Sequence, residues 1–244
     1  MKQLARRLKD IIKNKYFRNW EDPFLILSAQ SIINSPSWQA DPDFKDPFWL
    51  QSKEFRAYSQ FGDDGIIQWL IVALRIKNRR FVEFGVGDYF ESNTHFLLVN
   101  SSWDGYVIDG SKSNIHTIRE SSLYWRSRLS AESHFITKDN IRQLLSKSGA
   151  IDIGLLHIDL DGNDYWILDS LDIDAMNPDI LILEYNALFG ADRAISVPYD
   201  PEFDRHTAHF SGKYFGASLP ALNFLAEMRG YYFIGCNSAG NNAY

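Results

Sequence analysis

Glycine and acidic residues follow two apolar runs of this sequence at a spacing that suits nucleoside binding. The first run, Phe81–Phe84, contains Glu83 and leads directly into Gly85-Val86-Gly87; the second, 105–108, ends at Asp109. Glycines in such a turn let the backbone approach a ligand closely, and an acid after the next strand can accept hydrogen bonds from ribose hydroxyls. The pattern predicts a βαβ nucleoside-binding unit.

The residues around the glycine turn favour S-adenosylmethionine over a dinucleotide. Tyr89 and Phe90 stand where a third glycine would allow tight packing against a pyrophosphate. Glu83 lies inside the predicted strand, where a carboxylate suits a cationic or amino-bearing ligand. An NAD-linked oxidoreductase or epimerase is the alternative, although no tyrosine is followed by lysine in the Tyr-x-x-x-Lys spacing.

Oxygen-bearing side chains also follow two later apolar runs. Asp159 and Asp161 end one run, and Glu184 and Asn186 end the next. Carboxylates and amides are hard ligands, so these four residues are candidates to hold a divalent cation such as magnesium, which could activate an acceptor hydroxyl. The alternative is that 161–164, Asp-Gly-Asn-Asp, is a turn and helix cap.

A long segment, residues 196–216, separates the last of these runs from the next predicted helix. A connection of this length is often functional, and it contains histidines as well as aromatic and acidic residues. It could cover the acceptor and offer His209 as a general base. A histidine on the surface of an ordered loop is the alternative.

Strand and helix patterns alternate from about residue 59 to the end of the chain. The predicted strands cover residues 81–86, 105–109, 134–137, 153–159, 180–184 and 231–235. The predicted helices between and after them cover about 91–101, 112–129, 140–146, 165–171 and 218–228. This alternation predicts a Rossmann-like, doubly wound, mostly parallel sheet with helices on both faces, and ligands bind at the carboxyl ends of such strands.

Residues 1–57 form a predicted N-terminal helical and aromatic extension to a domain of residues 58–244. Leu4, Leu8 and Ile11 recur at helical spacing among cations near the start, and 24–33 is a second helical pattern. A basic amphipathic helix can lie on an anionic membrane or dock on a partner. Because the apolar stripe is narrow, we expect packing on the main domain or on a neighbouring copy, as in a homo-oligomer.

Composition limits the other classes of partner. The net charge of −6 argues against nucleic-acid binding, which needs a basic surface, and the single cysteine excludes a disulfide framework. The longest apolar run, 69–74, is too short for a transmembrane segment, and no targeting segment is evident. We expect a cytoplasmic protein with a small-molecule acceptor.

Four motifs resemble those of a known family. Val82–Asp88 looks like motif I of class I S-adenosylmethionine-dependent methyltransferases. Tyr58–Ile67, His157–Tyr165 and Leu183–Asn186 are similar to motifs of its FkbM-like branch, in the same order. The resemblance covers about residues 58–244 and implies O-methylation of a sugar-like or other small acceptor. A non-catalytic adenosyl-binding or assembly module is the alternative.

The resemblance also implies roles for individual residues. Glu83, Gly85 and Gly87 would contact the methionine part of the cofactor, Asp109 the ribose, Asp139 or Asn140 the adenine, and Asp159 would face the transferred methyl group. The chain departs from the family pattern at two places. Asp109 stands where glutamate is common. Residues 242–244 leave little length for a seventh strand that would pair antiparallel with 231–235.

Overall fold

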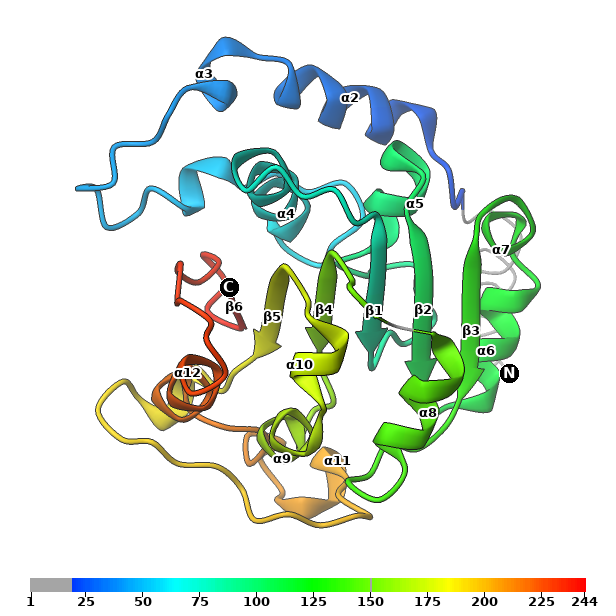
Figure 1. Cartoon of the computed structure of the whole chain (residues 1–244), viewed down its shortest axis with the longest axis vertical. Coiled ribbons are helices and arrows are strands. Elements are labelled where there is room, and N and C mark those ends of the chain that lie inside the picture. Colours follow the sequence, from blue (N-terminus) through cyan, green and yellow to red (C-terminus); the bar gives the residue numbers. More distant parts are fainter. Residues whose placement is uncertain (1–18, 150) are drawn as a thin grey trace, which may run out of the picture.

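A six-stranded sheet with the order β3-β2-β1-β4-β5-β6 forms the centre of the protein (Figure 1). The computed structural model describes residues 19–149 and 151–244. Its strands are β1 (Arg80–Phe84), β2 (Asp104–Asp109), β3 (Leu129–Ser133), β4 (Leu155–Ile158), β5 (Ile180–Glu184) and β6 (Asn242–Ala243). The first five run parallel and β6 is antiparallel to β5, so the predicted mostly parallel sheet is confirmed.

Helices pack on both faces of this sheet. Alternate residues of a strand point to opposite faces, so Phe81 joins one apolar core and Val82 the other. One core is covered by α4 (Asp63–Ala73), α5 (His95–Ser101), α6 (Lys112–Arg119) and α7 (Ser122–Arg126). The other is covered by α8 (Ile141–Ser148), α9 (Asp164–Ser170), α10 (Ile173–Met176) and α12 (Leu219–Glu227). The predicted doubly wound, Rossmann-like architecture is therefore confirmed.

The N-terminal extension packs against α4 and α5. Its helices are α2 (Pro23–Ile33), α3 (Pro36–Gln39) and the 3₁₀ turn η1 (Gln51–Lys53). Ala29, Trp38 and Phe55 form a small core with Phe96 of α5. The helix predicted near the start of the chain falls in residues 1–18, outside the described residues. Within the described ranges, no helix combines the length and apolarity needed to cross a bilayer.

The third strand lies earlier in the chain than predicted. The sequence pattern favoured 134–137, whereas β3 spans Leu129–Ser133 and pairs with β2. Leu129 and Ala131 are buried between more accessible residues, which is the alternation of a half-buried edge strand. After it, the His134 N–H donates to the Asp109 carbonyl, and the chain turns away from the sheet. The sequence pattern did not predict this strand, because polar residues outnumber its two buried apolar residues.

The segment predicted as the last strand, 231–235, is not one of the six strands of the sheet. The Tyr231 N–H bonds back to Ala226 at the end of α12, and the Ile234 N–H bonds to the carbonyl of Tyr244. The place beside β5 is taken by the two-residue strand β6. The sheet therefore does end in a short antiparallel strand, which pairs with β5 on one side. On its other side, backbone bonds join Tyr244 to Ile234 and Gly235, and Ala243 forms an antiparallel bridge with Cys236, so the expected antiparallel pairing is present at the end of 231–235.

The predicted helix over 112–129 is two helices. It breaks after α6, where the Ser121 hydroxyl accepts the Tyr124 N–H and caps α7. The helix predicted from residue 91 begins later, at His95, because residues 92–94 form a turn that bonds to a buried carboxylate described below.

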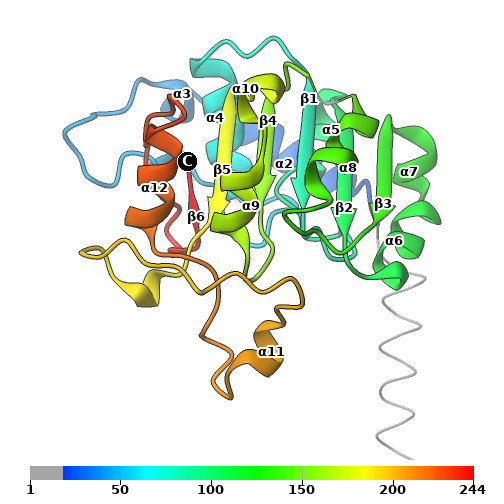
Figure 2. The ribbon, with the colours of Figure 1, turned by 60° about the horizontal axis from the view of Figure 1, so that its bottom comes forward.

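The carboxyl ends of the parallel strands meet at one edge of the sheet. The strand order reverses between β1 and β4, and in open α/β sheets ligands bind at such a switch point. Figure 2 shows the chain around α11 (Arg205–Ala208) extending beyond this edge. The other short element near it is the 3₁₀ turn η2 (Ala187–Phe189).

Candidate functional site

The two glycines after β1 are needed for different structural reasons. Both have positive φ, +74° at Gly85 and +56° at Gly87. A Cβ on Gly85 would lie 1.5 Å from the carbonyl oxygen of Asp159, so this glycine allows the ends of β1 and β4 to pack together. A Cβ on Gly87 would meet nothing within 4 Å. Close approach of a ligand is therefore an argument for Gly87 and not for Gly85.

Asp109 holds the glycine turn to the end of β2. Its Oδ2 accepts the Gly87 N–H at 2.8 Å. Its Oδ1 accepts the Ser111 N–H at 2.8 Å and the Asn114 side-chain amide at 3.0 Å. Each carboxylate oxygen has two lone pairs, so Oδ2 keeps capacity for a further donor such as a hydroxyl.

A pocket of about 320 Å³ opens at this edge of the sheet. This volume is in the range of small-molecule sites. Five residues singled out from the sequence line it together: Gly85, Gly87, Asp109, Asp159 and Asp161. The pocket therefore joins the predicted nucleoside half-site to the acidic cluster after β4.

Asp139 and Asn140 do not line this pocket. Asn140 holds its own loop instead: its side-chain amide donates to the Phe135 carbonyl at 2.8 Å, and its Oδ1 accepts the Thr137 N–H at 2.9 Å. Asp139 is exposed in the adjoining turn. The pocket wall after β3 is formed by His134, Phe135 and Ile136. The displacement follows from β3, which ends earlier than predicted.

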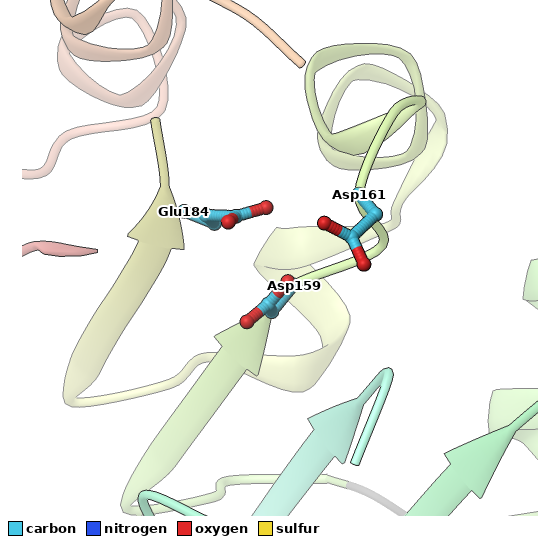
Figure 3. A group of neighbouring side chains, drawn as sticks. All are labelled: Asp159, Asp161 and Glu184. Atoms are coloured by element: carbon cyan, nitrogen blue, oxygen red, sulfur yellow. The ribbon is translucent and has the colours of Figure 1, made fainter. Parts of the chain in front are cut away.

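Three carboxylates converge beside the pocket (Figure 3). Glu184 comes from the end of β5, Asp159 from the end of β4, and Asp161 from the turn that follows β4. One oxygen of each lies within 4.8 Å of the others, which is a suitable spacing for shared ligation of one ion. The sequence-predicted group of metal ligands is thus brought together in three of its four members.

Burial and mutual repulsion perturb these carboxyls. Burial, and then the charge of Asp159, hold the pKa of Glu184 well above its usual range. Burial also raises the pKa of Asp159, which shares a hydrogen bond with Glu184. In addition, Glu184 Oε2 is buried and has no hydrogen-bond partner among the described residues. Such a cluster is stabilised by a bound proton or by a cation.

The turn after β4 is stabilised by its own residues, as the helix-cap alternative expected. Asp164 Oδ1 accepts the Leu160 N–H at 2.7 Å, and its Oδ2 accepts the Gly162 N–H at 3.1 Å. Asp161 adopts a left-handed conformation, with φ of +54°. The turn and the ligand group coexist, because Asp164 holds the backbone while Asp161 presents its carboxylate outward.

The segment 196–216 is bound to this turn. Asn163 donates its side-chain amide to the Asp200 carbonyl at 2.7 Å, and Trp166 donates its indole N–H to the Val197 carbonyl at 2.8 Å. Arg205 forms an ion pair with Asp161. The guanidinium of Arg205 also lies 3.7 Å from the centre of the Phe215 ring. A cation from this segment thus already neutralises part of the acidic group.

Glu83 is occupied by contacts inside the protein. Its Oε1 accepts from His157 Nδ1 at 2.8 Å, and its Oε2 accepts from Ser92 at 2.6 Å and from Thr94. Burial alone would raise the pKa of Glu83, but the bonds from His157, Ser92 and Thr94 outweigh it and lower the pKa. These contacts give Glu83 a structural role; its predicted contact with a cofactor stays a prediction.

His157 is a buried residue of β4 and has hydrogen-bond partners. Burial opposes its protonation, but the bond to Glu83 prevails and raises the pKa of His157. Its other ring nitrogen lies 3.3 Å from the Asn93 side-chain amide.

Asn186 and His209 are engaged elsewhere. The Asn186 amide donates to the carbonyls of Lys213 and Phe215, both at 3.0 Å, and its Oδ1 accepts the Leu188 N–H. It therefore anchors the segment 196–216 to the end of β5. His209 is exposed, bonds to Ser211 and does not line the pocket. Their predicted roles as metal ligand and general base stay predictions that no described contact supports.

The pocket wall also contains Asn114 and Phe203, which the sequence pattern did not predict. Asn114 lies in the first turn of α6, directly after the predicted acid Asp109, so its position near a ligand was open to inference. Phe203 gave no local signal, because it reaches the pocket only through the fold of a long loop. A Cβ on Gly162 would lie 2.2 Å from the Phe203 ring, so the absence of a side chain there makes room for it.

No protein-family model and no curated protein matches this sequence. Among solved structures, the chain is similar to the O-methyltransferase TomG of Streptomyces achromogenes, involved in tomaymycin synthesis, in complex with S-adenosylmethionine. The identity is 12%, the match covers 92% of this chain and 94% of that one, and the TM-score is 0.49.

Two further structures are similar at the same level. For the O-methyltransferase from Bacillus cereus in complex with S-adenosylhomocysteine, the identity is 14%, the coverage 97% and 94%, and the TM-score 0.45. For an S-adenosylmethionine-dependent methyltransferase from Geobacter sulfurreducens in complex with S-adenosylhomocysteine, the identity is 16%, the match covers 80% of this chain and 74% of that one, and the TM-score is 0.39.

Proposed function

We propose that this protein is an S-adenosylmethionine-dependent methyltransferase that methylates a hydroxyl of a small acceptor. One observation carries the proposal: a single pocket at the β1/β4 switch point is lined by Gly87 and Asp109 on one side and by Asp159 and Asp161 on the other. The first pair suits a nucleoside, and the second suits proton or metal chemistry beside it. A nucleoside-binding module alone has no need of the second pair.

Within this proposal, Gly87 and Asp109 hold the nucleoside part of the cofactor. Asp109 Oδ2 is positioned by the Gly87 N–H and has a lone pair for a ribose hydroxyl. When bound, the cofactor supplies a methyl group on a positively charged sulfur. The acidic residues at the end of β4 favour that charge and can take up the proton that the acceptor hydroxyl loses.

Asp159, Asp161 and Glu184 would hold a divalent cation of the magnesium type. Their oxygens are hard ligands, and the unpartnered, buried Glu184 Oε2 fits such an ion better than it fits an empty site. A cation here would lower the pKa of an acceptor hydroxyl. Arg205, which pairs with Asp161, would have to yield that carboxylate at least in part.

We further propose a polyhydroxyl, sugar-like acceptor and membership of the FkbM-like branch. The support for the acceptor is the chemistry of the pocket mouth, where acids and the ring of Phe203 lie together. Acids accept hydrogen bonds from hydroxyls, and an aromatic ring packs on the apolar face of a sugar. The support for the branch is the set of four motifs in the sequence.

Calorimetric titration with S-adenosylhomocysteine and NAD tests the cofactor. We expect S-adenosylhomocysteine to bind and NAD not to bind. Asp109→Asn should weaken S-adenosylhomocysteine binding by about tenfold, since a charged acceptor is lost. Asp104→Asn is the matched control, because Asp104 lies at the other end of β2 and pairs with Arg128. Binding of NAD alone would overturn the proposal.

A non-catalytic adenosyl-binding module is the second candidate. Arg205 stacks on the Phe215 ring and forms an ion pair with Asp161. This arginine already neutralises part of the acidic group, and that arrangement favours a binding module over an enzyme. Full biological activity of Asp159→Ala and Glu184→Ala variants would support this module over an enzyme.

A further inference from the structure

The outer face of α2 is apolar and exposed. The helix contains no charged residue over its 11 positions. Its side chains Phe24 and Leu27 are 80% and 62% exposed, and Leu25 and Ile32 are each 39% exposed. Single exposed apolar residues are common on protein surfaces. Several exposed apolar residues on one uncharged helix are typical of a surface that binds a partner or a membrane.

Residues on the inner face of α2 bind the helix to the rest of the protein, so its opposite face is exposed to solvent. Ala29 is buried in the small core of the extension, and Gln30 donates to Asn100 of the α5 end at 2.9 Å. Asp22 caps the helix by accepting the Phe24 N–H at 2.9 Å. In Figure 1, α2 lies on the outside of the molecule near the amino ends of the strands, away from the carboxyl edge that forms the candidate site.

The chain that leads into α2 is strongly cationic. Residues 1–18 contain seven of the 25 lysines and arginines and one of the 31 acids, although the whole protein has a net charge of −6. In the sequence this concentration of positive charge lies before the exposed apolar helix, separated from it by residues 19–22. Cations next to an apolar helix face are typical of peripheral attachment to anionic lipids.

The neighbouring element adds to this surface. Glu21, just before α2, pairs with Arg126 of α7 at 3.0 Å, which places α7 beside the start of α2 and neutralises that acid. The preceding residue of α7, Trp125, is 78% exposed. Tryptophan favours the boundary between lipid headgroups and acyl chains, because its ring is apolar and its N–H is polar.

We infer that the exposed apolar face of α2 docks on an anionic lipid bilayer surface. The apolar face supplies burial and the cations supply attraction, and interfacial helices need both. This inference is independent of the proposed activity.

Vesicle sedimentation tests the inference with the full-length protein. Vesicles of phosphatidylcholine alone are compared with vesicles of phosphatidylcholine mixed with phosphatidylglycerol. We expect at least about tenfold stronger binding to the anionic vesicles, and loss of that preference as salt is raised. The double variant Phe24→Ser/Leu27→Ser should reduce binding to anionic vesicles about tenfold or more, because it removes most of the exposed apolar area.

Phe224→Ser is the matched control. Phe224 is also an exposed phenylalanine, but it lies on α12, near the opposite end of the sheet from the start of α2 (Figure 1). It should leave vesicle binding unchanged, and circular dichroism should show all variants folded. Equal binding of the double variant and the parent would overturn the inference. So would a dimer in light scattering that the double variant converts to a monomer, because α2 would then cover a second copy.

Discussion

Glu83 on β1 and His157 on β4 form a buried ion pair across neighbouring strands, with 2.8 Å between Glu83 Oε1 and His157 Nδ1. The two residues are also partners in the strand register, so the backbone ladder sets their separation. Glu83 is at the same time the acceptor for the turn 92–94 that precedes α5. The pair therefore links β1, β4 and the loop after the glycine turn.

Glu83→Gln should destabilise the fold by about 3–5 kcal/mol, because it removes one partner of a buried pair and takes the carboxylate acceptor from His157, Ser92 and Thr94. Urea denaturation measures this free energy of unfolding.

The matched control is Glu91→Gln, which removes an exposed carboxylate paired with Arg56 at 2.8 Å. That change should cost less than about 1 kcal/mol, since surface ion pairs contribute little. If the two substitutions lowered the free energy of unfolding equally, the Glu83–His157 pair would contribute no more to stability than a surface ion pair.

The two glycines of the turn should respond differently to alanine. Gly85→Ala places a Cβ 1.5 Å from the Asp159 carbonyl oxygen and should prevent folding or cost more than about 3 kcal/mol. Gly87→Ala has open space and only backbone strain, so about 1–2 kcal/mol is expected. Thermal unfolding and soluble yield measure the difference, and similar behaviour of both variants would contradict the packing described for Gly85.

The acidic group should bind a divalent cation without any acceptor present. Manganese is a useful probe, because its free form is detected by electron paramagnetic resonance. Asp161→Asn should weaken manganese binding about tenfold, since one charged ligand is lost. Asp174→Asn, an exposed acid of α10 outside the group, should not change it.

Arg205→Gln provides a change of opposite sign at the same group. It removes the cation that pairs with Asp161, so manganese binding should become stronger. Absence of manganese binding in every variant would exclude the metal proposal and leave the cofactor proposal standing.

His95 should make stability depend on pH. Burial lowers the pKa of His95 to about 4, although the nearby carbonyls of Trp20, Phe90 and Tyr89 act to raise it. The unfolded chain has a histidine pKa of about 6.5 and therefore binds more protons between these values. Stability from this group is thus present above about pH 6.5 and is lost as the pH falls toward 4, by up to about 3 kcal/mol.

Urea denaturation across this pH range measures the effect. His95→Gln should flatten the dependence between pH 4 and 6.5, whereas His116→Gln, at an exposed histidine of α6, should leave it intact. An unchanged slope in the His95 variant would assign the acid sensitivity to other groups.

The sequence by itself predicted the features that depend on short spacings along the chain. The run into Gly85 and Gly87, and the acid Asp109 after the next run, predicted β1, the turn and β2. Asp159, Asp161 and Glu184 were placed at strand ends by the apolar runs before them. Parallel strands end at one edge of a sheet, so their proximity followed from the fold class.

Tertiary structure decided where each of these side chains is used. Glu83 bonds to His157, 74 residues away, and Phe203 reaches the pocket because Gly162 leaves room for its ring. Asn186 is directed to backbone carbonyls of the segment 196–216 and not to the acidic group. Local patterns show periodicity and residue type, whereas these contacts depend on loop closure and on which donors burial brings within hydrogen-bond distance.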